Sequence, residues 1–141
     1  MYSQVVWQHI RDPQHRGQLE GANGLGEGRY PKCGDHFILQ LRIEDQVIQE
    51  ACFLAKACAP VVAMGSVGCE LVRGLSLEQA LQVSAFQLDK ALGGLPPPKR
   101  HAILLFLESL YQAIHSYKPK NEKGLCYEKQ SNKEIPIDAT P

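Results

Sequence analysis

The order of hydrophobic patterns along the chain predicts an α+β fold, in which a small three-stranded antiparallel sheet carries helices on one face and a long helix comes last. Apolar and polar side chains alternate over residues 36–43, and a second apolar segment at 47–54 follows a tight Glu-Asp-Gln turn, which predicts a β-hairpin. From residue 59 to residue 117 the apolar residues instead follow helical spacing. Strands that precede the helices, rather than alternating with them, are typical of an α+β domain.

The residues before the hairpin predict one helix and the third strand. Residues 2–10 are expected to form a short helix that ends before Asp12-Pro13, because proline disfavours helical backbone in the residue before it. Residues 17–28 contain five glycines, which predicts a loop. A short edge strand at residues 26–30 would complete the sheet.

Four helices are predicted after the hairpin, at residues 59–72, 76–84, 85–92 and 99–117. Gly74 follows the first of them as a stop signal, and Ser76 with Gln79 forms a capping box at the start of the second. The three prolines at 96–98 are expected to form a stiff, extended lead-in to the last helix. The apolar stripe of that helix consists of Ile103, Phe106, Leu107, Leu110, Ile114 and Tyr117.

The composition is that of one globular domain with a polar tail. The chain has 141 residues, of which 44% are hydrophobic, so a substantial core can form. We expect a folded domain over residues 1–117. A flexible tail is expected over residues 118–141, which are polar, rich in lysine and glutamate and contain three prolines.

Charge and cysteine content narrow the possible partners and location. Fifteen basic residues balance fifteen acidic ones, which gives no electrostatic reason to expect nucleic acid or an anionic membrane as a partner. No apolar run approaches the roughly 20 residues that span a bilayer, and no secretory signal is visible. The five cysteines are odd in number and unlike a disulfide framework, so we expect a cytoplasmic protein with free or metal-bound thiols.

Four side chains at turns or element boundaries have metal-binding chemistry. Cys33 and Asp35 flank Gly34 just before the hairpin, Cys58 precedes the helix at 59–72, and His101 opens the last long helix. Two thiolates, a carboxylate and an imidazole would satisfy a tetrahedral zinc ion or the outer positions of an iron–sulfur cluster. Amide donors at the helix start favour a thiolate at Cys58. The sequence therefore predicts a metal site, provided that the fold brings these residues together.

Each candidate also has a structural interpretation without a metal. The Cys33-Gly34-Asp35 segment could be a simple turn, Cys58 a buried core thiol and His101 an ordinary surface histidine. Cys52, which alternates with the core residue Phe53, is expected on the open sheet face and outside the site. Two further cysteines remain: Cys69 is expected on a packed helix face, and Cys126 on the tail could either reach the site or stay free.

The order and spacing of six landmarks resemble those of the NifU N-terminal domain and IscU family over about residues 2–117. The resemblance implies a SufE/NifU-like fold. The landmarks are the helix end at residues 9–17, Cys33-Gly34-Asp35, Ala51-x-Phe53-x-x-x-Ala57-Cys58, Ala63-x-x-Ser66, Gly74-x-Ser76-Leu77 and Leu95-Pro96-Pro97-Pro98-Lys99-x-His101.

The resemblance implies an iron–sulfur cluster assembly scaffold rather than an enzyme. Such a protein binds iron, receives sulfur from a cysteine desulfurase and passes a transient [2Fe–2S] cluster to acceptor apo-proteins. Carried over by motif, the ligands of iron and cluster are Cys33, Asp35, Cys58 and His101. The segment Leu95 to Lys99 resembles the one that an Hsp70-type chaperone recognises in the family.

The chain departs from the family pattern at three positions. Ala102 stands where the family has a third cysteine, Ala57 where it has a glycine, and Pro98 where it has a valine. The chain also lacks a long insertion before Leu95, so it resembles the IscU branch more than the zinc-containing SufU branch.

Two other functions remain open at this point. A degenerate family member could bind a single zinc ion with the same four ligands, or act as an interaction module. A zinc hydrolase or deaminase is disfavoured, because the sequence contains neither a His-x-Glu nor a Cys-x-x-Cys pair.

Overall fold

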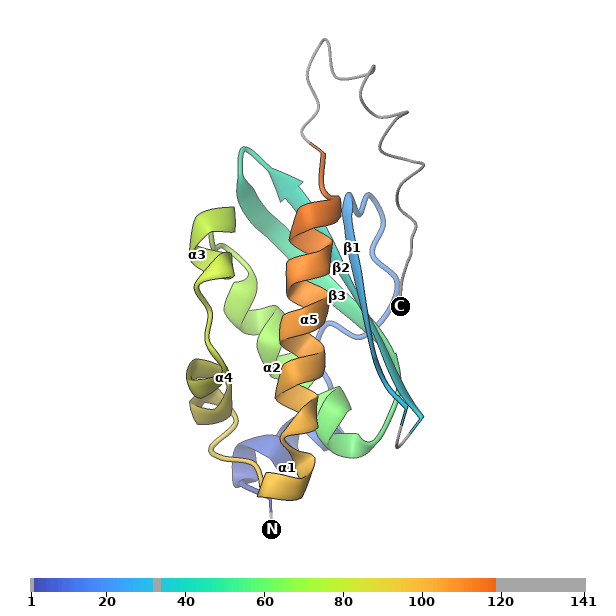
Figure 1. The fold of residues 1–141 in the computed structure, drawn as a ribbon, viewed down its shortest axis with the longest axis vertical. Coiled ribbons are helices and arrows are strands. Elements are labelled where there is room, and N and C mark those ends of the chain that lie inside the picture. The colour runs from blue at the N-terminus through green and yellow to red at the C-terminus, as the bar shows by residue number, and fades with distance from the viewer. Residues whose placement is uncertain (1, 32–33, 119–141) are drawn as a thin grey trace.

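The computed structural model describes residues 2–31 and 34–118 (Figure 1). Cys33 and almost the whole predicted tail at 118–141, including Cys126, lie outside the described residues. The helices and strands are α1 (Gln4–Arg11), β1 (Gly24–Tyr30), β2 (Asp35–Glu44), β3 (Val47–Lys56), α2 (Ala59–Val72), α3 (Leu77–Leu81), α4 (Ala85–Ala91) and α5 (His101–Ser116), with a 3₁₀ turn at Pro97–Lys99. The predicted α+β class, with strands before most of the helices, is confirmed.

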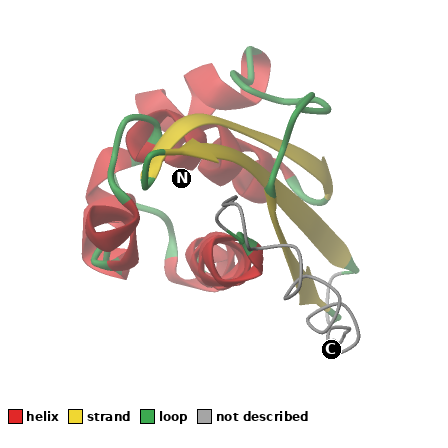
Figure 2. Cartoon of the chain, turned by 90° about the horizontal axis from the view of Figure 1, so that it is seen from above, coloured by secondary structure: helices red, strands yellow, loops and turns green. Residues whose placement is uncertain are grey.

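The three strands form one antiparallel sheet in the order β1-β2-β3, and Figure 2 shows it as a single curved layer. The alternating apolar residues of β2 are buried beneath α2 and α5, which both pack on this face. On the other face a loop crosses β2, where Gln40 accepts a hydrogen bond from the Leu19 amide (2.9 Å) and donates one to the Gly17 carbonyl (2.8 Å). The helices therefore occupy one face, as predicted, and a loop covers part of the opposite one.

The first strand is longer than the sequence suggested. Residues 24–30 form a strand, whereas the glycines were expected to make a loop up to residue 28. Gly24, Gly26 and Gly28 all face α5, and the helix backbone lies against them. A Cβ added at Gly24 would come within 2.8 Å of the Ala113 carbonyl oxygen, and one at Gly26 would lie still closer to that of Ser109. The glycines thus permit close strand-to-helix packing. The predicted edge strand at residues 26–30 is confirmed, and the loop prediction is wrong from Gly24 onward.

The same helix covers the outer edge of β1. The Leu25 amide donates to Ser116 Oγ at 2.9 Å, and the Glu27 amide donates to Gln112 Oε1 at 3.2 Å. These donors face away from β2 and would otherwise be unpaired within the protein. The position of α5 along β1 is therefore fixed by close packing and by hydrogen bonds to the strand edge.

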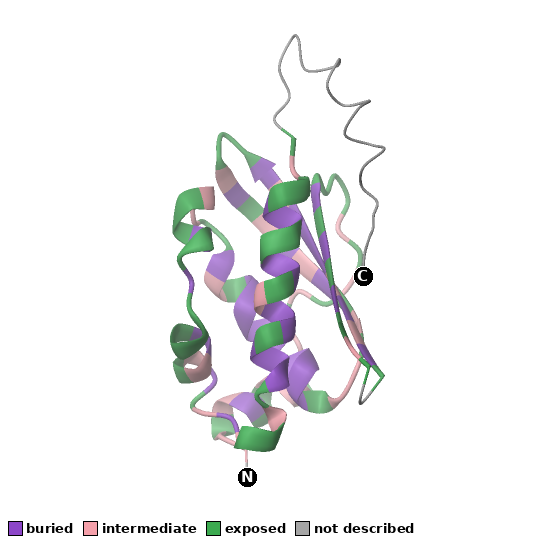
Figure 3. Ribbon diagram, viewed as in Figure 1, coloured by how far each residue is buried: buried purple, intermediate pink, exposed green. Residues whose placement is uncertain are grey.

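The remaining helices follow the sequence patterns with two corrections. The α2 bounds are as predicted and the Ser76 capping box is present, but α3 ends at Leu81 rather than at 84. Residues Pro97–Lys99 form a 3₁₀ turn, so the predicted extended lead-in is wrong beyond Pro96. Figure 3 shows a buried stripe along α5. Of the predicted stripe, Ile103, Phe106, Leu110 and Ile114 are buried, whereas Leu107 and the C-cap residue Tyr117 are half-buried. In the described ranges, no helix has the length and apolar character needed to cross a membrane.

Candidate metal centre

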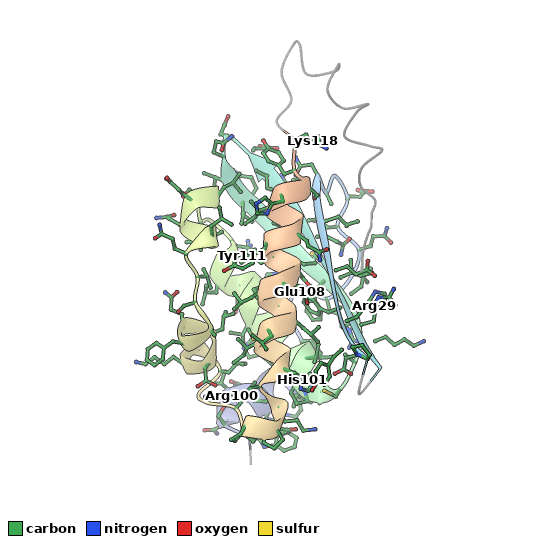
Figure 4. The ribbon with its side chains drawn as sticks, viewed as in Figure 1. Arg29, Arg100, His101, Glu108, Tyr111 and Lys118 are labelled. Carbon is green, nitrogen blue, oxygen red and sulfur yellow. The ribbon has the colours of Figure 1, made fainter. Side chains whose placement is uncertain are left out.

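Three of the four predicted ligands come together at one end of the sheet. Asp35 is the first residue of β2, Cys58 is the N-cap of α2, and His101 is the first residue of α5. One donor atom from each lies within 4.8 Å of the other two. Figure 4 shows His101 at the lower end of α5, near the β1–β2 hairpin and the start of α2. Cys33, which immediately precedes Gly34 in the sequence, lies outside the described residues.

The spacing of the three donor atoms suits a single coordinated ion. Asp35 Oδ2 lies 3.0 Å from His101 Nε2 and 3.4 Å from Cys58 Sγ, and the sulfur lies 3.9 Å from the same ring nitrogen. Ligands bound at about 2.0–2.3 Å in a tetrahedral arrangement are roughly 3.3–3.8 Å apart. Small side-chain movements would therefore bring all three atoms onto one ion, and the donor set fits zinc, iron or an iron of a cluster.

Asp35 connects the other two residues through hydrogen bonds. Asp35 is 4% exposed, and its Oδ1 accepts the backbone N–H of Cys58 at 3.0 Å. Oδ2 accepts from His101 Nε2 and from the Cys58 thiol. A buried carboxylate is costly unless it is hydrogen-bonded, and these three donors offset that cost. The carboxylate thereby ties the beginnings of β2, α2 and α5 together.

The surroundings of Cys58 favour the protonated form of its thiol. Burial raises the pKa of this thiol, and the Asp35 carboxylate raises it further, although the Val61 amide at the helix start lowers it. The helix start was expected to favour a thiolate. The Val61 amide does lower the pKa of Cys58, but the net effect of the surroundings is to raise it, so the expectation is wrong overall. A metal ion that binds the thiolate displaces this proton, and Asp35 Oδ2 is an acceptor 3.4 Å from the sulfur.

We expect replacement of Asp35 to increase the reactivity of Cys58. In Asp35→Asn the negative charge that favours the protonated thiol is lost, so the pKa of Cys58 falls and alkylation by iodoacetamide at neutral pH becomes faster. In the unmodified chain, the alkylation rate should continue to rise with pH above the ordinary thiol value of about 8.5.

Peptide mass spectrometry resolves this alkylation site by site. Cys52 serves as the internal control, since burial and Glu50 raise its pKa and Asp35 takes no part. A Cys58 rate that levels off at or below the ordinary thiol value would contradict the assigned environment.

His101 has a neighbour that the sequence interpretation missed. The ring of Tyr30 stacks on the imidazole with 4.2 Å between centroids and 16° between planes. Tyr30 is half-buried at the end of β1 and is the cross-strand partner of Asp35. Alternation along a strand puts Tyr30 on the same face as the three glycines. This pattern could have indicated the contact, but only if the strand had been predicted to begin at Gly24.

The other described cysteines lie outside the group. Cys52 is half-buried on β3, opposite Gln40, and its neighbour Phe53 is fully buried, as the alternation predicted. Cys69 is fully buried in α2, and this burial raises its pKa well above the ordinary value. Ala102, the next residue after His101, is also fully buried.

Two other sequence landmarks, the helix end at residues 9–17 and the Ala63-x-x-Ser66 motif, contact each other between α1 and α2. Ser66 Oγ lies 2.6 Å from His9 Nδ1 and accepts the Gln14 amide at 2.7 Å. Ser66 itself is fully buried. The bonds attach the segment after α1 to α2, beside a cleft of about 260 Å³ lined by Gln8, His9, Asp12 and Gln14. They explain these landmarks as structural residues.

Fold and site together define a small α+β domain with a candidate metal centre where the sheet meets two helices. The sequence profile described as the NifU-like N terminal domain matches residues 1–124. The chain belongs to this family, and the resemblance seen in its motifs is confirmed.

Individual relatives agree with this assignment. The chain is similar to the iron-sulfur cluster assembly scaffold protein IscU 1 of Archaeoglobus fulgidus, with 35% identity over 123 residues, covering 87% of this chain and 80% of that protein. The protein named IscU from Aquifex aeolicus is 33% identical over 142 residues, covering 94% and 90%.

A solved structure supports the fold. The structure titled as a putative iron-sulfur cluster assembly scaffold protein for the SUF system, from Fervidobacterium islandicum, superposes with a TM-score of 0.67 at 20% identity. The match covers 80% of this chain and 96% of that one. At this identity the likeness concerns the architecture only.

Proposed function

We propose that this protein is a scaffold on which an iron–sulfur cluster is assembled and from which it is transferred. The observation that carries the proposal is the convergence of the Asp35 carboxylate, the Cys58 thiol and the His101 imidazole. Cys33, two residues before Asp35 in the sequence, is the proposed fourth ligand. Relatives that align over most of their length are named as cluster assembly scaffolds, which supports the same function.

The mixed ligand set suits cargo that must be released. Iron is the first substrate, and a [2Fe–2S] cluster is the proposed product, with two thiolates, one imidazole and one carboxylate as its outer ligands. Carboxylate is a harder ligand than thiolate and binds a cluster iron less tightly, so Asp35 makes the site labile. The chain's residues bind and release this cargo, and we propose no catalytic turnover of a substrate.

The proposed partners follow from this role. A cysteine desulfurase supplies sulfur, and acceptor apo-proteins receive the cluster. We also retain an Hsp70-type chaperone as a proposed partner at Leu95 to Lys99. Leu95 is 5% exposed and Pro97–Lys99 form a turn, so a chaperone that binds extended chain would have to unwind this segment.

The location and extent of the scaffold are part of the proposal. We place it in the cytoplasm, where its thiols remain reduced. We take residues 1–117 as the scaffold domain, since Tyr117 is the C-cap of α5.

A single bound zinc ion is the second candidate function. Separations of 3.0, 3.4 and 3.9 Å suit one tetrahedral ion as well as an iron of a cluster. Metal content separates the two functions. One zinc per chain that iron and sulfide cannot displace would favour the zinc site over the scaffold.

Anaerobic reconstitution of this chain and of an Ala102→Cys variant tests the scaffold function. We expect visible charge-transfer absorption and equal cluster content in both proteins, because two thiolates, an imidazole and a carboxylate already provide two ligands for each iron. Iron and acid-labile sulfide are counted alongside the spectra. A cluster that forms only in Ala102→Cys would mean that the unmodified chain is not a competent scaffold.

A further inference from the structure

The contact between β1 and α5 repeats at a regular interval. Each step of two residues along the strand, about 6.6 Å, matches a step of four residues along the helix, about 6 Å. The side chains on this face of β1 are absent at three successive positions, which brings the helix backbone close. The contacts pair Gly24 with Ala113, Gly26 with Ser109 and Gly28 with Leu105.

The next step of this repeat brings Tyr30 opposite His101. Tyr30 is the first residue with a side chain on this face of the strand after the glycines, and His101 is the first residue of the helix. The rings stack with centroids 4.2 Å apart. Asp35 is the cross-strand partner of Tyr30, so both side chains reach His101. The Tyr30 phenol covers one face of the imidazole, and the Asp35 carboxylate accepts a hydrogen bond from Nε2 at the edge of the ring.

In the part of the chain that the structure describes, the imidazole lacks the hydrogen bond that usually orients a metal-binding histidine. Such a ring generally donates its second N–H to a carboxylate or a carbonyl, which holds its orientation when the other nitrogen binds an ion. Among the described residues, His101 Nδ1 is buried and has no hydrogen-bond partner. When an ion takes the Nε2 lone pair, the hydrogen bond to Asp35 is lost as well. Stacking on Tyr30 is then a contact that still resists rotation of the ring.

We propose that Tyr30 is a positioning residue for the metal centre, whose ring does for His101 what a hydrogen bond at Nδ1 does in other sites. The inference rests on the proposed function, since it assigns Tyr30 a part in holding the cargo. The aromatic face, rather than the hydroxyl, provides the effect. Tyr30→Phe should therefore preserve it, and Tyr30→Leu, which keeps an apolar side chain without a planar ring, should remove it.

Two measurements on the full chain test this role. The first is NMR of the metal-free protein, in which the stacked phenol shifts the ring C–H signals of His101 upfield. The second is the dissociation constant for cobalt(II), read from its absorption spectrum. Tyr111→Leu is the matched control, because Tyr111 is 40% exposed and lies about 15 Å along α5 from His101.

We expect Tyr30→Leu to lose the upfield shift and to bind cobalt(II) about 10- to 100-fold more weakly, as is typical when the group that orients a ligand is removed. Tyr30→Phe and Tyr111→Leu should match the unmodified chain in both measurements. Weak binding by Tyr30→Phe would make the hydroxyl responsible and overturn the proposal. Unchanged affinity in Tyr30→Leu, with or without loss of the shift, would overturn it too.

The NMR measurement separates this inference from the proposed function. If the unmodified chain binds no cobalt(II), the proposed function fails, and the positioning role for cargo fails with it. An upfield shift that remains in that case would establish the stack alone. Should Tyr30→Leu not fold, as judged by loss of NMR dispersion, absence of the shift in the unmodified chain or in Tyr30→Phe would still refute the inference.

Discussion

Among the glycine-to-alanine substitutions in β1, Gly26→Ala is expected to lower the free energy of unfolding the most. The new Cβ would overlap the carbonyl oxygen of Ser109, in the middle of α5. Backbone cannot rotate away as a side chain can, and α5 is also held by hydrogen bonds to the strand edge on either side of Gly26. We expect a loss beyond the roughly 1–3 kcal/mol typical of an overpacked core, or failure to fold cooperatively. Urea unfolding followed by circular dichroism measures it.

Two neighbouring substitutions calibrate this result. Gly28→Ala should cost less, because its Cβ would stand 3.0 Å from Leu105 atoms, one of them in a side chain that can shift. Leu25→Ala changes a 57% exposed residue on the opposite face and should stay within about 0.5 kcal/mol of the unmodified chain. If Gly26→Ala unfolds at the same urea concentration as Leu25→Ala, the close helix-to-strand contact described here is incorrect.

The second large effect is expected from Cys58→Ala, which removes one proposed ligand. Cobalt(II) affinity should fall by more than the roughly 10- to 100-fold that loss of an orienting neighbour costs. The sulfur-to-metal absorption should weaken as well. The fold should survive, because the bond from the residue-58 backbone amide to Asp35 does not involve the thiol.

Cys52→Ala is the matched control for this loss. Cys52 is also a half-buried free thiol, but it lies on β3 outside the group. Its removal should leave cobalt(II) affinity and absorption unchanged. If both variants bind equally well, or if Cys52→Ala loses the metal while Cys58→Ala retains it, the assignment of the centre is wrong.

The sequence predicted those parts of the fold in which local pattern and tertiary packing agree. Alternation over 36–43 and the change to helical spacing at 59 gave β2 and α2 with little error, because each buries one regular face. The glycines of β1 were misread, because glycine is a loop signal when only its neighbours in sequence are considered. These glycines allow the close approach of α5, which begins more than 70 residues later in the sequence.

The candidate site was predictable as a set of residues and less so as an environment. Side-chain chemistry and motif order pointed to Asp35, Cys58 and His101, and the fold brings these three together. The raised pKa of Cys58 was not predictable, since it depends on burial and on a carboxylate 23 positions away. The stacking of Tyr30 likewise depends on the alignment of a strand with a helix, which no local pattern encodes.

The most direct test of the central claim is the iron and acid-labile sulfide content of the unmodified full chain after anaerobic reconstitution, measured beside Cys58→Ala. If Asp35, Cys58 and His101 hold a cluster, the unmodified protein will contain iron and sulfide in equal amounts, and Cys58→Ala will lose most of both. Iron without labile sulfide, or equal retention of both by Cys58→Ala, would contradict it.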